Sequence, residues 1–484
     1  MTRNSTTSDG TNDYPERQRA KSAASENHRH DPRHAREVSM KLAKFVHDLN
    51  IDALSQEVRG QGLRVIRDTL GTMLAGATLP EIRTLVKMMG AFGCSGSSTL
   101  MGCQDTVSPH VAALVNGTGA VSLELDEGNQ YALNHPAVHI LPAALAVAEE
   151  QKQTGAELLT AFIAGYEVAV RVGAATHLRE AVHPFGTHAI VGTAAAASRL
   201  LSLDEEQIAQ SLDLAAGICV ASSQTAANTG ASVRNLFTGL TNHNGLLAPL
   251  LVRAGFTGEP GSLNVVFGSI LGDSFRDNEL GDDLGREFCI NRNYFKVYAC
   301  SRWNHAPIEA MAALLARASF KTQDVDEIIV WTYDPATRLS WNDPTNGYAA
   351  KHSIPYNVAV RLVRGSNDLE AYTDEAVSDP KVQAVARRVV VREDPALTAM
   401  LPDVRPARVE VKLRHGSRLT ESVERPRGGF DNPLTERELE NKFRRLVRMT
   451  LPGPSAEALE EMLMTLPELE DVTLLRPLLQ GVTI

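Results

Sequence analysis

Residues Gly192–Leu201 read Gly-Thr-Ala-Ala-Ala-Ala-Ser-Arg-Leu-Leu, a run typical of a helix whose small side chains allow neighbouring helices to approach closely. The chain as a whole has the same character, because 43% of its residues are hydrophobic and only 5% are aromatic. This composition favours closely packed helices over a sandwich or a barrel. We therefore expect a mainly α fold.

The remainder of the chain divides into a helical region and a mixed region. With 484 residues it exceeds the size at which one core usually stops growing, so two domains are expected. From about residue 38 to 285, apolar residues recur at helical spacing, as in 155–172 and 239–255. Further on, 327–333 and 407–414 alternate apolar and polar side chains, as half-buried strands do.

Helices predicted at 306–318 and 356–364 complete a small α+β unit between these strands. Two later helices, 435–451 and 455–463, suggest that the C-terminus packs back on the first domain. We predict a disordered tail, a large all-helical domain built from both chain ends, and a smaller α+β lid over a cleft; the ranges are 1–36, 37–288 with 432–484, and 289–431.

Charge and cysteine usage exclude several classes of protein. The net charge of -10, without a basic stripe, argues against nucleic acid as a partner. The five cysteines are scattered and lack CxxC or zinc-ligand spacing, which fits a reducing cytoplasm and no metal. No stretch reaches the uninterrupted apolar length of a membrane span, so no membrane association is expected. The polar residues 1–36, with His28, His30 and His34, lack the apolar core of a secretion signal.

The segment from Leu123 to Pro136 carries the chemistry that the sequence suggests most strongly. It reads Leu-Glu-Leu-Asp-Glu-Gly-Asn-Gln-Tyr-Ala-Leu-Asn-His-Pro, between two apolar runs. Burial of Glu124, Asp126 or Glu127 would raise their pKa values, and His135 would be a usable base near neutral pH. The alternative is a solvated helix end with His135 next to a helix cap.

Three further clusters combine charged and hydrogen-bonding side chains. Arg234 lies among small residues before a helix, where it can bind a carboxylate or simply lie on the surface. The segment 296–305 contains Lys296, Tyr298, Arg302 and His305, a set able to hold an anion and donate a proton. Lys351-His352-Ser353-Ile-Pro-Tyr356 is either a polar site cluster or an ordinary helix cap by Ser353.

Other chemistries find less support. Cys300 has no base partner at a suggestive spacing, so a buried structural thiol is the better interpretation. Neither GxGxxG after a strand nor GxxxxGK[ST] is present, which argues against nucleotide chemistry.

From about Val38 to the C-terminus, the chain resembles the MmgE/PrpD superfamily of 2-methylcitrate dehydratases, cis-aconitate decarboxylases and iminodisuccinate epimerases. The resemblance rests on several blocks in family order: 123–127 with His135-Pro136, the Gly-Thr and Ala-rich run from Gly186, Val233-Arg-Asn with Gly239, 296–305, Ser353 with Tyr356, and Asn432-Pro-Leu-Thr with Lys442-Phe-Arg.

The resemblance implies a homodimer without metal or organic cofactor that acts on small di- or tricarboxylates by proton transfer next to a carboxylate. His135 would be the acid/base residue, with Glu124 and Asp126 orienting it or the substrate. The other site residues that we predict are Lys296, His305 and Tyr356 as catalytic groups, and Arg234, Arg302, His188 and Tyr298 as substrate-binding groups.

The chain departs from the decarboxylase pattern at several positions. Glu124 stands where those relatives have aspartate, Gly128 where they have threonine, and Arg234 where they have lysine. Their second active-site histidine would correspond to His183 or His188, and the alignment leaves this choice open.

Our leading hypothesis is therefore a cofactor-independent lyase that dehydrates a citrate-like hydroxy polycarboxylate. The alternatives are an epimerase of an imino- or amino-dicarboxylate, a cis-aconitate-type decarboxylase, and a catalytically silent helical dimer that only binds carboxylates.

Overall fold

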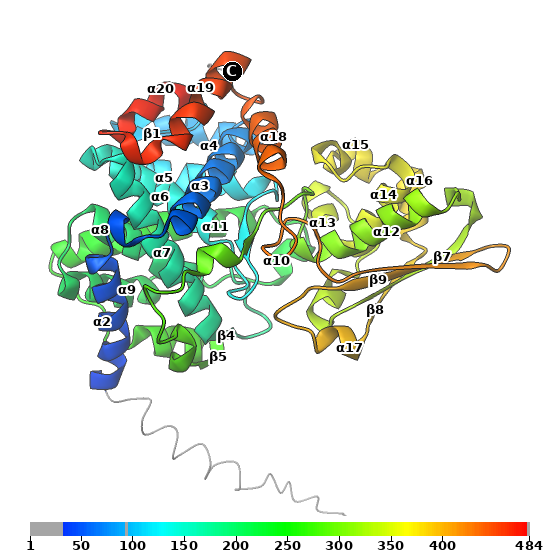
Figure 1. Cartoon of the computed structure of the whole chain (residues 1–484), viewed down its shortest axis with the longest axis horizontal. Helices are drawn as coiled ribbons and strands as arrows, with labels where there is room; N and C mark the ends of the chain where they lie inside the picture. The colour runs from blue at the N-terminus through cyan, green and yellow to red at the C-terminus, as the bar shows by residue number, and fades with distance from the viewer. Residues whose placement is uncertain (1–31, 92–94, 482–484) are drawn as a thin grey trace, which may run out of the picture.

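The computed structural model describes residues 32–91 and 95–481. A large helical part and a smaller part with a sheet lie side by side, and the helical part contains both ends of the described chain (Figure 1). This confirms the predicted fold class, mainly α with a smaller α/β domain. Most of the predicted tail lies outside the described residues, but its last five belong to a helix that begins at Pro32.

Helices of the first half of the chain form the core of the large part. They are α2 (Pro32–Asp48), α3 (Gln56–Gly76), α4 (Pro80–Ala91), α5 (Pro109–Ser122), α6 (Pro136–Gln151), α7 (Gly155–Ala175), α8 (Ala189–Leu200), α9 (Glu205–Gly217), α10 (Thr225–Asn228) and α11 (Val233–Arg253). Short strand pairs join their loops: β1 (Ser95–Thr99) with β2 (Thr106–Val107), and β4 (Thr176–Leu178) with β5 (Gly272–Phe275).

Close backbone contact between α7 and α8 explains the alanine-rich run. A Cβ at Gly165 would lie 2.5 Å from the carbonyl oxygen of Gly192, and a Cβ at Gly192 would lie 2.3 Å from that of Gly165. Helix α7 is long and apolar enough to cross a membrane, a length that the sequence analysis did not attribute to any stretch. However, 94% of its most apolar window is buried inside the protein, as in the core helix of a globular fold.

The smaller part is built on a four-stranded sheet of order β10-β9-β7-β8. Its strands are β7 (Val325–Thr332), β8 (Val389–Glu393), β9 (Ala407–Leu413) and β10 (Arg418–Val423), with β7 and β8 parallel and the other pairs antiparallel. Helix α12 packs on β9 and β10, and α14 packs on β8. The helices of this part are α12 (His305–Arg317), α13 (Gly347–Lys351), α14 (Ile354–Arg364), α15 (Asp374–Val377), α16 (Pro380–Ala386) and α17 (Pro395–Thr398).

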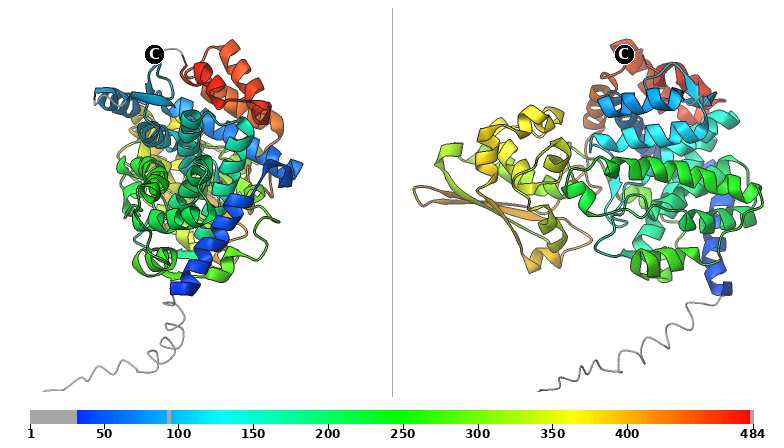
Figure 2. Two further views of the ribbon diagram at one scale, coloured as in Figure 1. Left: turned by 90° about the vertical axis from the view of Figure 1, so that its left-hand side faces the viewer. Right: turned by 180° about the vertical axis from the view of Figure 1, so that it is seen from behind.

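The C-terminal segment returns to the helical part, as the sequence suggested. Helices α18 (Glu436–Val447), α19 (Gly453–Met464) and α20 (Arg476–Leu479) lie beside the N-terminal helices (Figure 2). Both α18 and α19 pack on α3, where the Phe443 ring occupies the space next to Gly71. Lys442 on the same helix forms a buried ion pair with Asp68 of α3, with 2.7 Å between Nζ and Oδ1.

Gly192→Ala is expected to lower the free energy of unfolding by about 1–3 kcal/mol, because the added methyl group has to force α7 and α8 apart. Urea denaturation followed by circular dichroism measures this change. Gly217→Ala is the matched control, since a Cβ at this helical glycine meets nothing within 4 Å. Equal stability of the two variants would contradict the proposed helix contact.

Candidate active site

An acidic loop, residues 123–127, follows α5 and forms the centre of the site. Glu124 and Asp126 are buried, whereas Leu123 and Leu125 belong to the hydrophobic core around the sheet. Glu124 has a φ of 55°, which is uncommon for a residue with a side chain. The alternation of apolar and acidic residues thus places the two carboxylates together in the interior, and neither is a solvated helix end.

Two antiparallel strands bring a lysine to this loop. In β3 (Gly128–Asn129) and β6 (Asn293–Tyr294), Gly128 pairs with Tyr294. Lys296 lies two residues after Tyr294, and its Nζ is 2.9 Å from Oε2 of Glu124 and 3.0 Å from Oδ1 of Asp126. These carboxylates outweigh the effect of burial and raise the pKa of Lys296, so the ammonium stays charged.

Arg234, at the start of α11, supplies the second buried cation. It forms an ion pair with Glu124 and lies over the ring of Phe185, 4.1 Å from the ring centroid. Burial alone would raise the pKa of Glu124, but Arg234 and Lys296 together hold it well below its ordinary value. Asp126 behaves in the same way, and Lys296 and His135 lower its pKa to about 2. Both carboxylates are therefore ionised.

His135 lies at the other oxygen of Asp126, with 2.5 Å between Nδ1 and Oδ2. Burial lowers its pKa although Asp126 opposes this shift, so the ring is neutral near pH 7. Contact with the carboxylate places the proton on Nδ1, as in other carboxylate-oriented histidines. Nε2 then has a free lone pair, and the Tyr294 hydroxyl is 3.4 Å from it.

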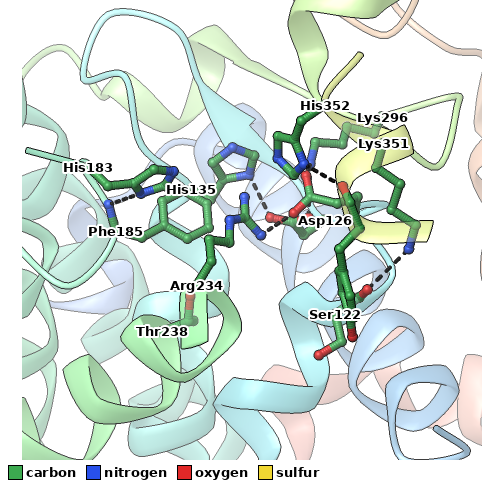
Figure 3. Close-up of polar contacts among 12 residues, drawn as sticks. Ser122, Asp126, His135, His183, Phe185, Arg234, Thr238, Lys296, Lys351 and His352 are labelled. Carbon is green, nitrogen blue, oxygen red and sulfur yellow. Dashed lines mark hydrogen bonds and ion pairs between the residues drawn. The ribbon is translucent and has the colours of Figure 1, made fainter. Parts of the chain in front are cut away.

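His183 has the opposite tautomer. Its Nδ1 accepts a hydrogen bond from the backbone N–H of Phe185 at 3.0 Å, so a neutral ring carries its proton on Nε2. Burial, assisted by Arg234 and His352, lowers the pKa of His183 well below its ordinary value. Figure 3 shows His183 and His135 on the same side of the acidic loop as Arg234.

The smaller part contributes Lys351 and His352 from the end of α13. Nδ1 of His352 is 3.0 Å from the carbonyl oxygen of Tyr348, so this nitrogen is the donor and Nε2 the acceptor. Burial lowers the pKa of His352 to about 4. Lys351 donates to the carbonyl oxygen of Ser122 at 3.2 Å, and burial lowers its pKa to about 8.

Three other predicted site residues, Arg302, His305 and Tyr298, contact one another. Nδ1 of His305 is 3.1 Å from Arg302, which donates to the carbonyl oxygens of Pro426 and Arg427 and lies over the Tyr294 ring. The His305 ring also makes an edge-on contact with the Tyr298 ring, with 5.0 Å between the ring centroids.

Tyr356 and His188 make contacts elsewhere. The Tyr356 hydroxyl donates to the carbonyl oxygen of Ala371, inside the core of the smaller part. Ser353 caps α14 at the N–H of Tyr356, as the alternative interpretation of that segment proposed. His188 hydrogen-bonds Asn134 at 3.1 Å and packs against Phe267. Among the described residues, no hydrogen bond or ion pair joins Tyr356 or His188 to Glu124 or Asp126.

The sequence did not indicate Tyr294 or Phe185 as site residues, and it left Lys351 and His352 open between a polar site cluster and a helix cap. One signal pointed to Tyr294: the glycine at position 128, where the decarboxylase pattern has threonine. A Cβ at Gly128 would lie 2.4 Å from the Tyr294 hydroxyl. The missing side chain therefore makes room for the tyrosine next to His135.

Glu127 points away from the cluster. The Tyr166 hydroxyl of α7 donates to it at 2.5 Å, and burial raises its pKa to about 8. It is thus largely protonated at pH 7, although Asp126, the adjacent residue in the sequence, is ionised. In the part of the chain that the structure describes, no group of three or more His, Cys, Asp or Glu side chains is arranged to hold a metal ion.

Comparison with known families identifies the family of the chain. The MmgE/PrpD N-terminal domain matches residues 40–270, and the MmgE/PrpD C-terminal domain matches residues 298–467. The chain therefore belongs to the MmgE/PrpD family.

Curated relatives narrow the class of reaction. Mouse cis-aconitate decarboxylase is 26% identical over 465 residues, which cover 92% of this chain and 93% of the relative. The Aspergillus terreus enzyme of the same name is 25% identical, over 91% and 96%. The 2-methylcitrate dehydratase of Salmonella typhimurium is 26% identical over 254 residues, covering 48% of this chain and 51% of the relative. Decarboxylases and dehydratases of this kind are lyases, so the chain is an enzyme of the lyase class.

Glu127→Gln is expected to change how stability depends on pH. The pKa of Glu127 is raised in the folded protein, so its contribution is fully present below about pH 4.5 and is lost as the pH rises towards 8. Between pH 5 and pH 8, the free energy of unfolding of the variant should therefore fall by at least about 1 kcal/mol less than that of the wild type. Urea unfolding at both pH values tests this, with the exposed Glu461→Gln as control; parallel pH curves for wild type and Glu127→Gln would refute it.

Proposed function

We propose that the chain is a lyase that removes water from a citrate-like hydroxy tricarboxylate, with His135 as the group that moves the proton. The supporting observation is the orientation of two neutral histidines. His135, held by Asp126, offers a lone pair at Nε2, and His183, held by the backbone, offers an N–H at Nε2. A dehydration needs both functions at once, a proton acceptor at carbon and a hydrogen-bond donor at the departing hydroxyl.

The reaction then proceeds by transfer of one proton. Nε2 of His135 takes the hydrogen next to a substrate carboxylate, and Asp126 stabilises the imidazolium that forms. His183 donates a hydrogen bond to the neighbouring hydroxyl. His135 returns its proton to this oxygen, the C–O bond breaks with its electron pair on oxygen, and the products are water and a carbon–carbon double bond.

Buried cations stabilise the charge that develops on the substrate. Removal of the proton places additional negative charge on the adjacent substrate carboxylate. Arg234 and Lys296 would stabilise this charge while they remain paired with Glu124 and Asp126. Such preorganised electrostatic interactions in a dry site usually supply a large part of the rate enhancement, whereas acid–base help contributes about 10²–10⁴-fold.

A second candidate is the decarboxylation of a cis-aconitate-like substrate. It is favoured by the matches to cis-aconitate decarboxylases, which extend over more than nine tenths of the chain. The same histidine would then protonate carbon after loss of CO2. The threonine and lysine of the decarboxylase pattern are replaced here by Gly128 and Arg234, which supports the dehydratase as the leading proposal.

Proton NMR in D2O with citrate, 2-methylcitrate, cis-aconitate and aspartate-derived dicarboxylates distinguishes the reactions. A vinylic signal formed from a hydroxy acid supports the dehydratase, and loss of CO2 from cis-aconitate supports the decarboxylase instead. Deuterium uptake with inversion and no elimination would replace both with an epimerase.

His135→Gln is expected to lower kcat by about 10²–10⁴-fold with an unchanged melting temperature, because the proton acceptor is lost while the amide retains polar contacts. The same NMR assay measures turnover. His177→Gln, at an exposed position on β4, is the matched control and should remain fully active. A His135→Gln enzyme with native activity would exclude the proposed role.

Tyr294→Phe is expected to lower kcat about tenfold, because the Tyr294 oxygen can accept a hydrogen bond from Nε2–H once His135 has become an imidazolium. Its hydroxyl lies beside Nε2 of His135, and the ring itself is retained. Steady-state kinetics should show the loss mainly in kcat. A change confined to KM would instead place Tyr294 in substrate binding.

A further inference from the structure

A cavity lies where the two parts of the chain meet, behind the acidic loop. Its volume is about 380 Å³, within the usual range for small-molecule sites. It is lined by the segment after β6, by the end of α14 with the loop that follows it, and by one face of α18. Among the lining residues are Lys296, Tyr298, Arg361, Asp368, Lys442 and Arg445. Arg445 is 46% exposed, so the rim of the cavity reaches solvent.

Cations outnumber carboxylates on these walls. The lining includes two lysines and two arginines, against the carboxylates of Asp368 and Glu438. Both carboxylates are already engaged, Asp368 by Arg445 and Glu438 by Arg427. Lys296, Lys442 and Arg445 are neutralised by carboxylates of the acidic loop, of α3 and of the cavity itself, which leaves Arg361 as the lining cation without an ion pair among the residues that the structure describes.

Arg361 is the least satisfied of these cations. It forms no ion pair within 4 Å among residues 32–91 and 95–481; Glu309 acts on it only at longer range. Its Nη1 donates to the carbonyl oxygen of Gly365 at 2.6 Å, whereas Nε is buried without a hydrogen-bond partner. A partly buried guanidinium with unused donors is costly in the absence of an anion.

The facing wall is connected to the candidate active site. Lys442, on α18, donates to the carbonyl oxygen of Leu125 at 2.7 Å, between the two site carboxylates. Lys296 holds those carboxylates directly. An anion in the cavity would thus lie against the two lysines that support the acidic loop from behind.

We propose that this junction cavity is a second, non-catalytic site that binds a small polyanion bearing phosphate or carboxylate groups. Arg361 and Arg445 make the principal contacts. The proposal does not depend on the lyase reaction, because binding is measurable without turnover.

Isothermal titration calorimetry of the full chain with pyrophosphate and with tricarballylate tests the site. Arg361→Gln and Arg445→Gln are each expected to weaken binding about tenfold, the loss of one charge-assisted contact. Arg364→Gln is the matched control, because this residue lies on α14 and pairs with Asp379 outside the cavity. Arg445 is at the rim, so its replacement leaves a folded protein even if Arg361→Gln does not.

Each outcome bears on the proposal. Weaker binding of pyrophosphate alone in the two cavity variants indicates a phosphate-bearing ligand, and weaker binding of tricarballylate alone indicates a carboxylate-bearing one. The proposal would be overturned if neither probe binds. It would also be overturned if Arg445→Gln, like the control Arg364→Gln, leaves the affinity for both probes unchanged. If tricarballylate binds only in the active site, its affinity stays unchanged in the cavity variants, since the cavity arginines do not reach that site.

Discussion

The buried ion pairs of Glu124 and Asp126 with Arg234 and Lys296 are the constraint on which the rest of the structure depends. Charges are tolerated in a dry interior only when each has its partner, and removal of one partner typically costs about 3–5 kcal/mol. Because the acidic loop, α11 and the segment after β6 each supply part of the network, none of these elements can shift alone. The smaller part contacts the same region through Lys351, which donates to the carbonyl oxygen of Ser122 just before the acidic loop.

The end of the chain serves this centre as well. Lys442 of α18 reaches a carbonyl oxygen of the acidic loop while it pairs with Asp68 of α3. The loop needs this support, because Glu124 adopts a left-handed backbone conformation that is sparsely populated by residues with side chains. The packing of C-terminal on N-terminal helices is therefore connected to the geometry of the site as well as to the hydrophobic core.

Whether a site residue could be predicted from the sequence depended on where the polar group of its side chain finds its hydrogen-bond or ion-pair partner. Asp126, His135 and Lys296 were predictable because ionisable groups next to apolar runs have to find partners in the interior. Tyr356 is of an equally suggestive type, but a single backbone carbonyl satisfies its hydroxyl away from the cluster. Sequence spacing does not distinguish a side chain that meets its partner locally from one that reaches across domains.

The sequence by itself determined the helical architecture, the return of the C-terminus and membership of a lyase family, since these follow from periodicity, composition and ordered motifs. Only the tertiary structure decided which of the buried acidic side chains are ionised. Glu127 is protonated at pH 7 and Asp126 is ionised, although the two residues are adjacent in the sequence and both are buried. It also decided which nitrogen of His135 and of His183 carries the proton. Protonation depends on the charges and backbone groups within a few ångströms, and distant segments of the chain supply these only after folding.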